Sequence, residues 1–177
     1  MSTIRVVHGS CADQNVDAVV NAANKFLAAG GGICGVIFRK AGAEELAEAC
    51  AEHATPLRDG EAVITPAFRL RNARYIIHAV GPNFSITPDA FRELFDAYYN
   101  SLVILMENGL HSISFPLISA GIFGGHLAHV AAESAKQCYD AYQAFVKAYP
   151  DYTVDVCLCA FSDDEYEEVR HVCMNLS

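Results

Sequence analysis

Residues 21–35, NAANKFLAAGGGICG, contain the residue types and spacing that point most directly to chemistry. Gly30, Gly31 and Gly32 follow one another beside hydrophobic residues, although every ordered glycine costs backbone entropy. Glycines just before a helix let a ligand reach the backbone amides at the helix N-terminus, and such amides bind anions without lysine. The segment therefore predicts an anion site made of main chain. Close packing of a helix on the sheet is the alternative reason for the glycines.

Residues 119–125, SAGIFGG, form a second glycine-rich segment between a predicted strand and a predicted helix. Two such loops on one edge of a sheet suit a ligand with two phosphates. The pattern GxxxxGK[ST] is absent, and GxGxxG does not follow the first predicted strand, which disfavours a P-loop nucleotidase and a conventional dinucleotide dehydrogenase. The ligand class that remains is an adenine nucleotide or a related diphosphate.

The elements that must position these loops follow from the hydrophobic pattern. The predicted strands are residues 4–9, 17–23, 61–67, 75–82, 112–119 and 153–161. The predicted helices begin at Gly35, at Thr87-Pro88-Asp89, after the second glycine-rich segment and at residue 163; the second ends at Gly109 and the third at about Tyr149. Strands that alternate with helices indicate an α/β fold with a central mixed, mostly parallel sheet. Ligands bind beyond the carboxyl ends of such strands, where residues 21–35, 78–84, 119–125 and 160–164 are expected.

Composition and charge limit the classes of function. The chain has 177 residues, 53% of them hydrophobic, and a formal net charge of −9. It can fill a core, and it is a poor candidate for binding duplex nucleic acid through phosphate neutralisation. No apolar segment approaches the ~20 residues of a membrane span, and residues 1–10 lack the features of a secretory signal. Seven cysteines without a CxxC pair predict buried thiols in a reducing cytoplasm rather than disulfides or a metal site. We therefore expect a cytoplasmic protein that needs neither cofactor nor metal.

Three motifs, VDAVVNAANKFLAAGGGICGVIFRKAG, YIIHAVGP and ISFPLISAGIFGG, occur in an order and spacing that resemble the macro domain, a module that binds ADP-ribose. The resemblance covers essentially the whole chain. It implies one macro domain over residues 1–177, built as a three-layer α/β/α sandwich, and a partner that is ADP-ribose or a macromolecule carrying it. The residues expected to contact the ligand are Ser10, Cys11, Ala22, Asn24, Gly31, Gly32, Ile33, Cys34, Gly35, Ser119, Ala120, Gly121, Ile122, Phe123, Gly124 and Phe161.

The resemblance also implies a role for each part of this site. The loops 30–35 and 119–124 would surround the diphosphate. Asn24 matches the residue that hydrogen-bonds the distal ribose, Phe123 the ring that packs on that ribose, and Phe161 the ring that stacks near adenine. These residue types suit the roles, because an amide can donate to and accept from hydroxyl groups without adding charge. An exposed aromatic ring likewise offers a flat apolar face to a purine.

Two departures from the family pattern bear on function. Ser10 stands where many members have an aspartate that accepts a hydrogen bond from the adenine amine, and a neutral hydroxyl accepts a weaker one. Asp163 or a backbone carbonyl is the candidate replacement. Cys34 and Phe38 stand where the hydrolase branch has an aspartate and a histidine, and Ala29 stands where other hydrolase-like members have a histidine. We predict that Cys34 is a small packing residue rather than a catalytic thiolate.

The expected function is binding of ADP-ribose and its derivatives. The leading enzymatic interpretation is hydrolysis of ADP-ribosyl esters, or removal of acetyl from O-acetyl-ADP-ribose. Asn24 would then act by positioning the distal ribose and a water, while loop amides stabilise developing charge. The alternative is a non-catalytic reader of ADP-ribose, which the missing carboxylate favours. Four other polar residues are interpreted as structural. Asn21 is expected at a turn or sheet edge and His78 in the core, and Thr65 and His126 are given no more specific place.

Overall fold

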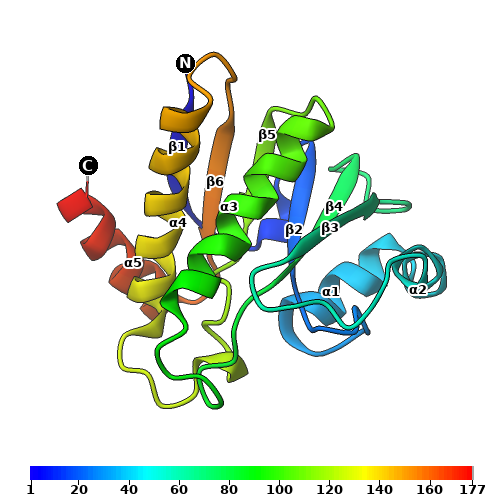
Figure 1. Ribbon diagram of the computed structural model, residues 1–177, viewed down its shortest axis with the longest axis horizontal. Coiled ribbons are helices and arrows are strands. Elements are labelled where there is room, and N and C mark those ends of the chain that lie inside the picture. The colour runs from blue at the N-terminus through cyan, green and yellow to red at the C-terminus, as the bar shows by residue number, and fades with distance from the viewer. Residues whose placement is uncertain (177) are drawn as a thin grey trace.

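The computed structural model describes the backbone of residues 1–176 and the side chains of residues 1–173. Its centre is a six-stranded sheet in the order β1-β6-β5-β2-β4-β3 (Figure 1). The strands are β1 (Thr3–His8), β2 (Ala18–Ala23), β3 (Ala62–Pro66), β4 (Tyr75–Val80), β5 (Ser112–Phe115) and β6 (Asp155–Ala160). Neighbouring strands pair in parallel except β3 and β4, which are antiparallel. The predicted mixed, mostly parallel sheet is confirmed.

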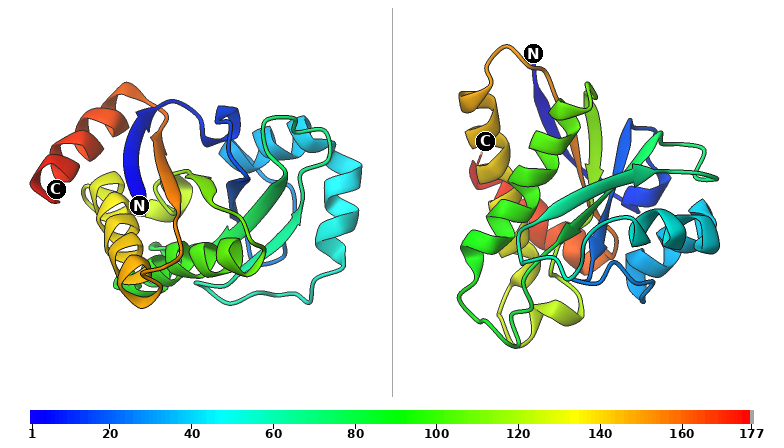
Figure 2. Two further views of the ribbon diagram at one scale, coloured as in Figure 1. Left: turned by 90° about the horizontal axis from the view of Figure 1, so that it is seen from above. Right: turned by 45° about the vertical axis from the view of Figure 1, so that its right-hand side comes forward.

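Helices cover both faces of this sheet (Figure 2). The helices are α1 (Gly32–Ala41), α2 (Ala43–Ala51), α3 (Phe91–Glu107), α4 (Val130–Ala148) and α5 (Asp163–Leu176). One hydrophobic core joins α3, α4 and α5 to one face, and a second core joins α1 and α2 to the other. The predicted three-layer α/β/α sandwich is therefore confirmed.

Alternation along the strands supplies both cores. In β6, Val156 and Leu158 belong to the core beneath α3–α5, whereas Cys157 and Cys159 belong to the core beneath α1 and α2. Successive side chains of a strand point to opposite faces, so a strand covered on both sides is apolar throughout. All seven cysteines are buried and free, which confirms the prediction of buried thiols.

Two helix starts differ from the prediction. The helical segment expected from Gly35 begins three residues earlier, at Gly32, and is divided into α1 and α2 at Gly42, whose φ of 103° interrupts the helix. The start expected at Thr87 is wrong, because α3 begins at Phe91 without a side-chain cap. The Thr87 hydroxyl instead donates to the carbonyl of Asn83, at 3.3 Å, in the preceding turn. A local side-chain bond has therefore competed with helix capping.

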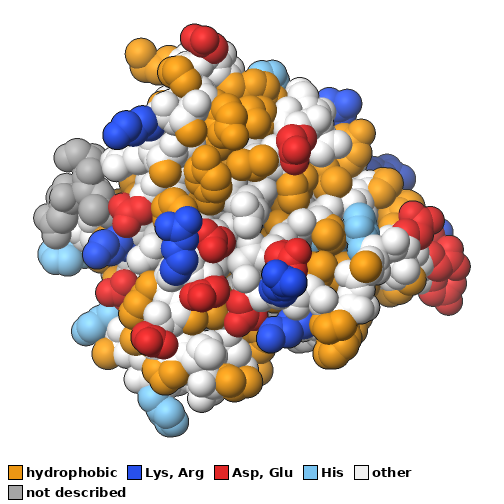
Figure 3. Space-filling model, viewed as in Figure 1, with side chains coloured by type: hydrophobic (Ala, Val, Ile, Leu, Met, Phe, Trp, Pro, Cys, Tyr) orange, Lys and Arg blue, Asp and Glu red, His pale blue; other side chains and the backbone are white. Residues whose placement is uncertain are grey.

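The surface seen in Figure 3 carries charges of both signs, with acidic side chains gathered at the end where α2 lies and apolar side chains between α3 and α4. This face has no continuous basic region that would complement a nucleic-acid backbone. Within residues 1–176, none of the helices is long and apolar enough to cross a membrane.

Candidate ligand-binding site

A cavity of about 400 Å³ lies where the parallel strands end, at the lower edge of the sheet in Figure 1. Segments that are far apart in the sequence meet around it. It is lined by Gly9, Ser10, Cys11, Gly32, Ile33, Val36, Pro116, Leu117, Ala120, Gly121, Cys159, Phe161 and Glu165. Three of the four segments expected at this edge contribute, namely 21–35, 119–125 and 160–164. A volume of this size suits a small organic ligand.

The cavity brings together part of the set of residues predicted to contact a ligand. The predicted residues that line it are Ser10, Cys11, Gly32, Ile33, Ala120, Gly121 and Phe161. The predicted residues that do not line it are Ala22, Asn24, Gly31, Cys34, Gly35, Ser119, Ile122, Phe123 and Gly124. The lining residues that the sequence did not single out are Gly9, Val36, Pro116, Leu117, Cys159 and Glu165. Contact of any of these residues with a ligand stays a prediction.

The glycines of the first loop meet different physical requirements. A Cβ on Gly35 would lie 2.6 Å from the carbonyl oxygen of Gly30, so close packing of α1 on its own loop excludes a side chain there. Gly32 has a φ of +58°, a conformation that glycine adopts without strain. A Cβ on Gly31 would meet no atom within 4 Å. Packing therefore explains Gly35, while Gly31 borders open space.

The N-terminus of α1 has amides available to an anion. Gly31 is the N-cap residue and makes no side-chain capping bond. The first amides of a helix have no partner within the helix, and they carry the positive end of the helix dipole. Because Gly32 and Ile33 also line the cavity, these donors lie at its wall.

The Asn24 side chain is hydrogen-bonded within its own loop. Its Oδ1 accepts from the amides of Phe26 and Ala28, both at 3.1 Å, and its Nδ2 donates to the Ala28 carbonyl at 2.9 Å. An amide nitrogen carries two hydrogens, so one N–H of Asn24 remains for another acceptor. Asn24 thus fixes the loop that leads to the glycines and keeps a single donor in reserve.

Cys34 is a buried side chain in the first turn of α1, with 5% of its surface exposed. The thiol donates to the Ala28 carbonyl at 3.7 Å and accepts from Nδ2 of Asn21 at 3.7 Å. The burial of Cys34 agrees with the predicted packing role, and its lack of a catalytic role stays a prediction. No carboxylate replaces it among the lining residues of this loop.

Asn21 lies in the middle of the sheet, not at a turn or sheet edge as predicted, because β2 pairs with both β4 and β5. Its Nδ2 donates to Nδ1 of His78 at 3.1 Å, and Nε2 of His78 lies 3.0 Å from the Thr65 hydroxyl. His78 and Thr65 are thus hydrogen-bonded core residues, as predicted. Burial lowers the pKa of His78 to about 3, so the ring is neutral and carries its proton on Nε2.

The second loop is held by the segment that follows β4. The Ser119 hydroxyl donates to the Pro82 carbonyl at 2.7 Å, and the Phe84 amide donates to the Phe123 carbonyl at 2.7 Å. A Cβ on Gly81 would lie 2.4 Å from Oγ of Ser119, so glycine is required there. The fourth expected segment, 78–84, therefore supports the cavity without lining it.

The second loop does not lead directly into a helix, contrary to the prediction. Residues Ile122–Gly124 form a short 3₁₀ turn, and α4 begins only at Val130. The amides near the cavity therefore belong to a tight turn rather than to the N-terminus of α4. A Cβ on Gly121 would meet no atom within 4 Å, which leaves this side of the cavity open as well.

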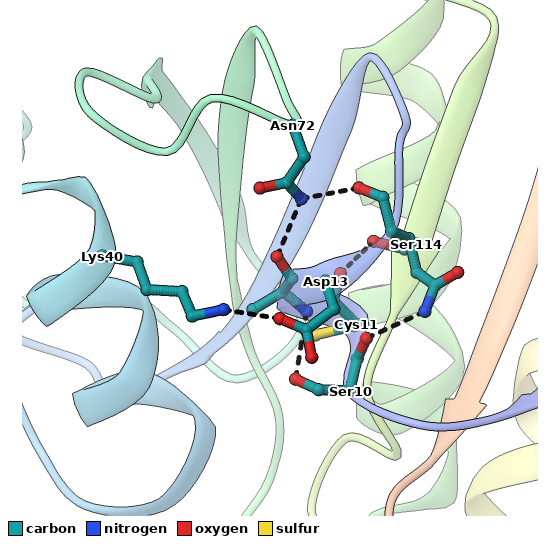
Figure 4. Close-up of polar contacts among 8 residues, drawn as sticks. Ser10, Cys11, Asp13, Lys40, Asn72 and Ser114 are labelled. Carbon is teal, nitrogen blue, oxygen red and sulfur yellow. Dashed lines mark hydrogen bonds and ion pairs between the residues drawn. The ribbon is translucent and has the colours of Figure 1, made fainter.

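The segment after β1 is fixed by a dense set of polar contacts (Figure 4). Asn72 donates to the carbonyls of Ala12 and Gln14 at 2.8 and 2.7 Å, and the Ser114 hydroxyl donates to the Cys11 carbonyl at 2.8 Å. The hydroxyl of Ser10 accepts from the Ala12 amide at 3.2 Å. Ser10 is thus used as a cap for the 3₁₀ turn Cys11–Asp13.

The wall of the cavity contains the thiols of Cys11 and Cys159, which stay protonated. Cys11 donates to the Val20 carbonyl at 3.5 Å, and the sulfur atoms of Cys157 and Cys159 lie 3.6 Å apart. Burial raises the pKa of Cys11, and the hydrogen bond to Cys157 together with burial raises that of Cys159. A neutral thiol behaves as a small apolar group, so this wall is apolar.

At the β6 end, Phe161 and Glu165 line the cavity, and the Phe161 side chain is 73% exposed. Asp163, the carboxylate suggested from the sequence, instead pairs with Nε2 of His8 at 3.1 Å. Glu165 was missed, although Ser162-x-x-Glu165 matches the S-x-x-E pattern of a capping box after a strand. Within residues 1–173, no group of three or more His, Cys, Asp or Glu side chains could hold a metal ion.

Comparisons with known proteins agree with this geometry. The model of the macro domain family matches residues 20–134. An O-acetyl-ADP-ribose deacetylase of Citrobacter rodentium is 40% identical over 162 residues, which cover 88% of this chain and 88% of that protein. The match to an uncharacterised Thermotoga maritima protein, 36% identical, covers 94% of this chain but 27% of that protein.

Solved structures are similar over nearly the whole chain. A macrodomain of Oceanobacillus iheyensis with ADP has a TM-score of 0.86 at 34% identity, covering 99% of this chain and 92% of that chain. A Trypanosoma brucei macrodomain in complex with ADP-ribose has a TM-score of 0.83 at 31% identity, covering 97% of this chain and 68% of that chain. Sequence and structure agree with the resemblance first noted in three motifs, and the chain belongs to the macro domain family.

Proposed function

We propose that residues 1–177 form one macro domain that binds ADP-ribose, free or attached to a macromolecule. One observation carries the proposal: Gly32 and Gly121 line the same cavity from two different loops, and a Cβ on either would meet no atom within 4 Å. The φ of +58° accounts for glycine at position 32, but neither packing nor a positive φ requires Gly121 to lack a side chain. A ligand that approaches the backbone of Gly121 from between the loops does.

The surroundings suit the parts of ADP-ribose in order. The first-turn amides of α1 and the turn at 121–124 supply donors for the two phosphates. Phe161, exposed at the cavity, offers a face on which adenine can stack. The remaining N–H of Asn24 is a donor for the distal ribose. The net charge of −9 makes these local donors, rather than the overall field, the source of attraction.

The comparisons support this choice of ligand, because the similar Trypanosoma brucei structure contains ADP-ribose and the Oceanobacillus iheyensis structure contains ADP. A thermal unfolding series with ADP-ribose tests it. A ligand at 100 times its dissociation constant stabilises the folded state by about 2.7 kcal/mol, so the midpoint should rise with ADP-ribose concentration. An unchanged midpoint at millimolar ADP-ribose would contradict the proposal.

A second candidate function is hydrolysis of ADP-ribosyl esters or deacetylation of O-acetyl-ADP-ribose. The reserve N–H of Asn24 and the activity in the name of the Citrobacter rodentium relative favour it. Asn24 would position the distal ribose while a water attacks, giving free ADP-ribose and a carboxylic acid, or acetate in the deacetylation. Positioning alone supplies several kcal/mol of a barrier. Incubation with a mono-ADP-ribosylated acceptor and quantification of released ADP-ribose distinguishes this enzyme from a reader, which would release none.

A further inference from the structure

We infer that the Glu165 carboxylate recognises the adenosine half of the bound nucleotide: it accepts hydrogen bonds from donors there and rejects ligands that carry a further phosphate on that half. The inference rests on the proposed function, since it assigns a selectivity to the same cavity. It concerns one residue that neither the sequence motifs nor the two glycine-rich loops pointed to.

Glu165 stands apart from its neighbours in the cavity wall. It is the one charged residue among the described residues that line the cavity. It follows Phe161 by four residues, across the start of α5, and both residues line the cavity. The proposed stacking of adenine on Phe161 therefore places the adenosine half of the ligand next to this carboxylate.

The carboxylate is held in place before any ligand arrives. Its Oε1 accepts from the amide and the hydroxyl of Ser162 at 3.2 and 3.1 Å, and the Glu165 amide donates to the Ser162 hydroxyl at 3.1 Å. This reciprocal pair is a capping box at the start of α5. Oε2 makes no hydrogen bond to any described residue. One oxygen thus anchors the group, and the other remains an acceptor.

Other acceptors near this end are already engaged. The Ser10 hydroxyl accepts from the Ala12 amide, and Asp163 pairs with His8. Asp163 does not line the cavity, so Glu165 is the carboxylate with an unused oxygen there.

The adenosine half of ADP-ribose offers only a few donors, which are the exocyclic amine of adenine and the two hydroxyls of the adjoining ribose. A carboxylate accepts from either kind, and such charge-assisted bonds are about twice as strong as neutral ones. A phosphate on the 2′-hydroxyl would remove a donor and place a like charge beside Glu165. Selectivity would then come from repulsion as well as attraction.

The test compares the wild type with Glu165→Gln and Glu167→Gln. Glutamine keeps the Oε1 that the capping box needs, so the first variant removes the charge and preserves the helix start. Glu167 lies on the same helix, is exposed and contacts Arg170 at 3.5 Å; its substitution removes the same charge without touching the cavity. Calorimetry is run with ADP-ribose, its 2′-phosphate and its inosine analogue, which lacks the amine.

The wild type should bind the 2′-phosphate, the inosine analogue or both at least about tenfold more weakly than ADP-ribose. For each analogue, the ratio of its dissociation constant to that of ADP-ribose should fall to within a few-fold of one in Glu165→Gln. In Glu167→Gln this ratio should stay at its wild-type value. Loss of discrimination against the 2′-phosphate identifies the ribose hydroxyls as the donors, and loss against the inosine analogue identifies the amine. Ratios in Glu165→Gln that match the wild type would overturn the inference and leave Glu165 as a capping residue alone. A wild type that binds none of these ligands would contradict the proposed function itself.

Discussion

A glutamate at position 121 should abolish ligand binding and leave the fold intact. Gly121 lines the cavity, has a φ of −86°, and a Cβ there would meet no atom within 4 Å. A Cβ at this position therefore introduces no clash with neighbouring atoms. The new side chain must extend into the open space that we assign to the diphosphate.

The expected loss follows from Coulomb's law and from steric overlap. A carboxylate about 5 Å from one phosphate charge is repelled by about 0.8 kcal/mol in water, and by about 3 kcal/mol at the effective dielectric constant of a protein surface site. Two phosphate charges double these values, which corresponds to a loss of affinity between about tenfold and more than 1,000-fold. Overlap of the side chain with the ligand adds to this.

Isothermal calorimetry with ADP-ribose measures the effect, and thermal unfolding verifies that the variant is folded. Gly121→Gln is the matched control, because it has nearly the same shape without the charge. It should bind more tightly than Gly121→Glu, by a difference that shrinks as salt is added. Wild-type affinity in a folded Gly121→Glu variant would show that the diphosphate lies elsewhere.

Three further outcomes are expected. Gly35→Ala should lower the free energy of unfolding by more than about 2 kcal/mol, because its Cβ would lie 2.6 Å from the Gly30 carbonyl; a change below about 0.5 kcal/mol in urea unfolding would contradict the packing argument. Burial, and secondly the charge of a neighbouring histidine, lowers the pKa of His78 to about 3, so the unfolded chain binds the proton first, near pH 6.5. The stability that neutral His78 contributes should be complete above about pH 6.5 and fall toward pH 3, by up to about 1.4 kcal/mol per pH unit. Urea unfolding between about pH 7 and 4 should show that the free energy of unfolding falls more steeply with falling pH in the wild type than in His78→Gln. Equal slopes in the two proteins would rule out His78 as the cause. If the chain hydrolyses ADP-ribosyl esters, Asn24→Ala should slow the release of ADP-ribose at least about tenfold, while the rate of Cys34→Ala stays within a few-fold of the wild type. A large loss of rate in Cys34→Ala with little loss in Asn24→Ala would indicate a thiolate mechanism instead of positioning.

The sheet and its helical layers could be predicted from the sequence because burial on both faces makes the inner strands largely apolar. The helix start at Thr87 could not, because Thr-Pro-Asp is a capping pattern only where the chain is free to adopt it. There, Asn83 organises a turn in which its side chain accepts from the Ser85 amide and its carbonyl accepts from Thr87. Local hydrogen bonds outside the helix decided the boundary.

The two glycine-rich loops could also be predicted from the sequence, but the role of each glycine could not. The sequence offers packing and ligand approach as equal reasons, and only the positions of neighbouring atoms separate Gly35, which packing requires, from Gly121, which it does not. Asn21 shows a similar limit: its type suggested a turn, whereas its Nδ2 donates to buried His78 inside the sheet and its Oδ1 has no hydrogen-bond partner among the described residues. Such pairings depend on register between strands, which a single sequence does not reveal.

Residues lining the cavity from β6 and α5 were the least predictable. Cys159 reaches it because alternation along β6 turns that side chain toward the cavity, and the phase of the alternation follows only from the pairing of strands. Glu165 did carry a readable signal, the capping-box spacing from Ser162. This spacing predicts only that a helix starts there. The position of that helix start at the end of the cavity follows from the fold.

Calorimetric titration of the wild type with ADP-ribose and, separately, with AMP tests the central claim most directly. AMP supplies the adenine and one phosphate, whereas ADP-ribose also supplies the second phosphate and the distal ribose that the loops at Gly32 and Gly121 and the reserve N–H of Asn24 would hold. Each tenfold in affinity corresponds to about 1.4 kcal/mol, and a few added hydrogen bonds to charged oxygens exceed that. We predict that ADP-ribose binds at least about tenfold more tightly than AMP. Equal affinity for the two ligands would contradict a site built from two loops around a diphosphate.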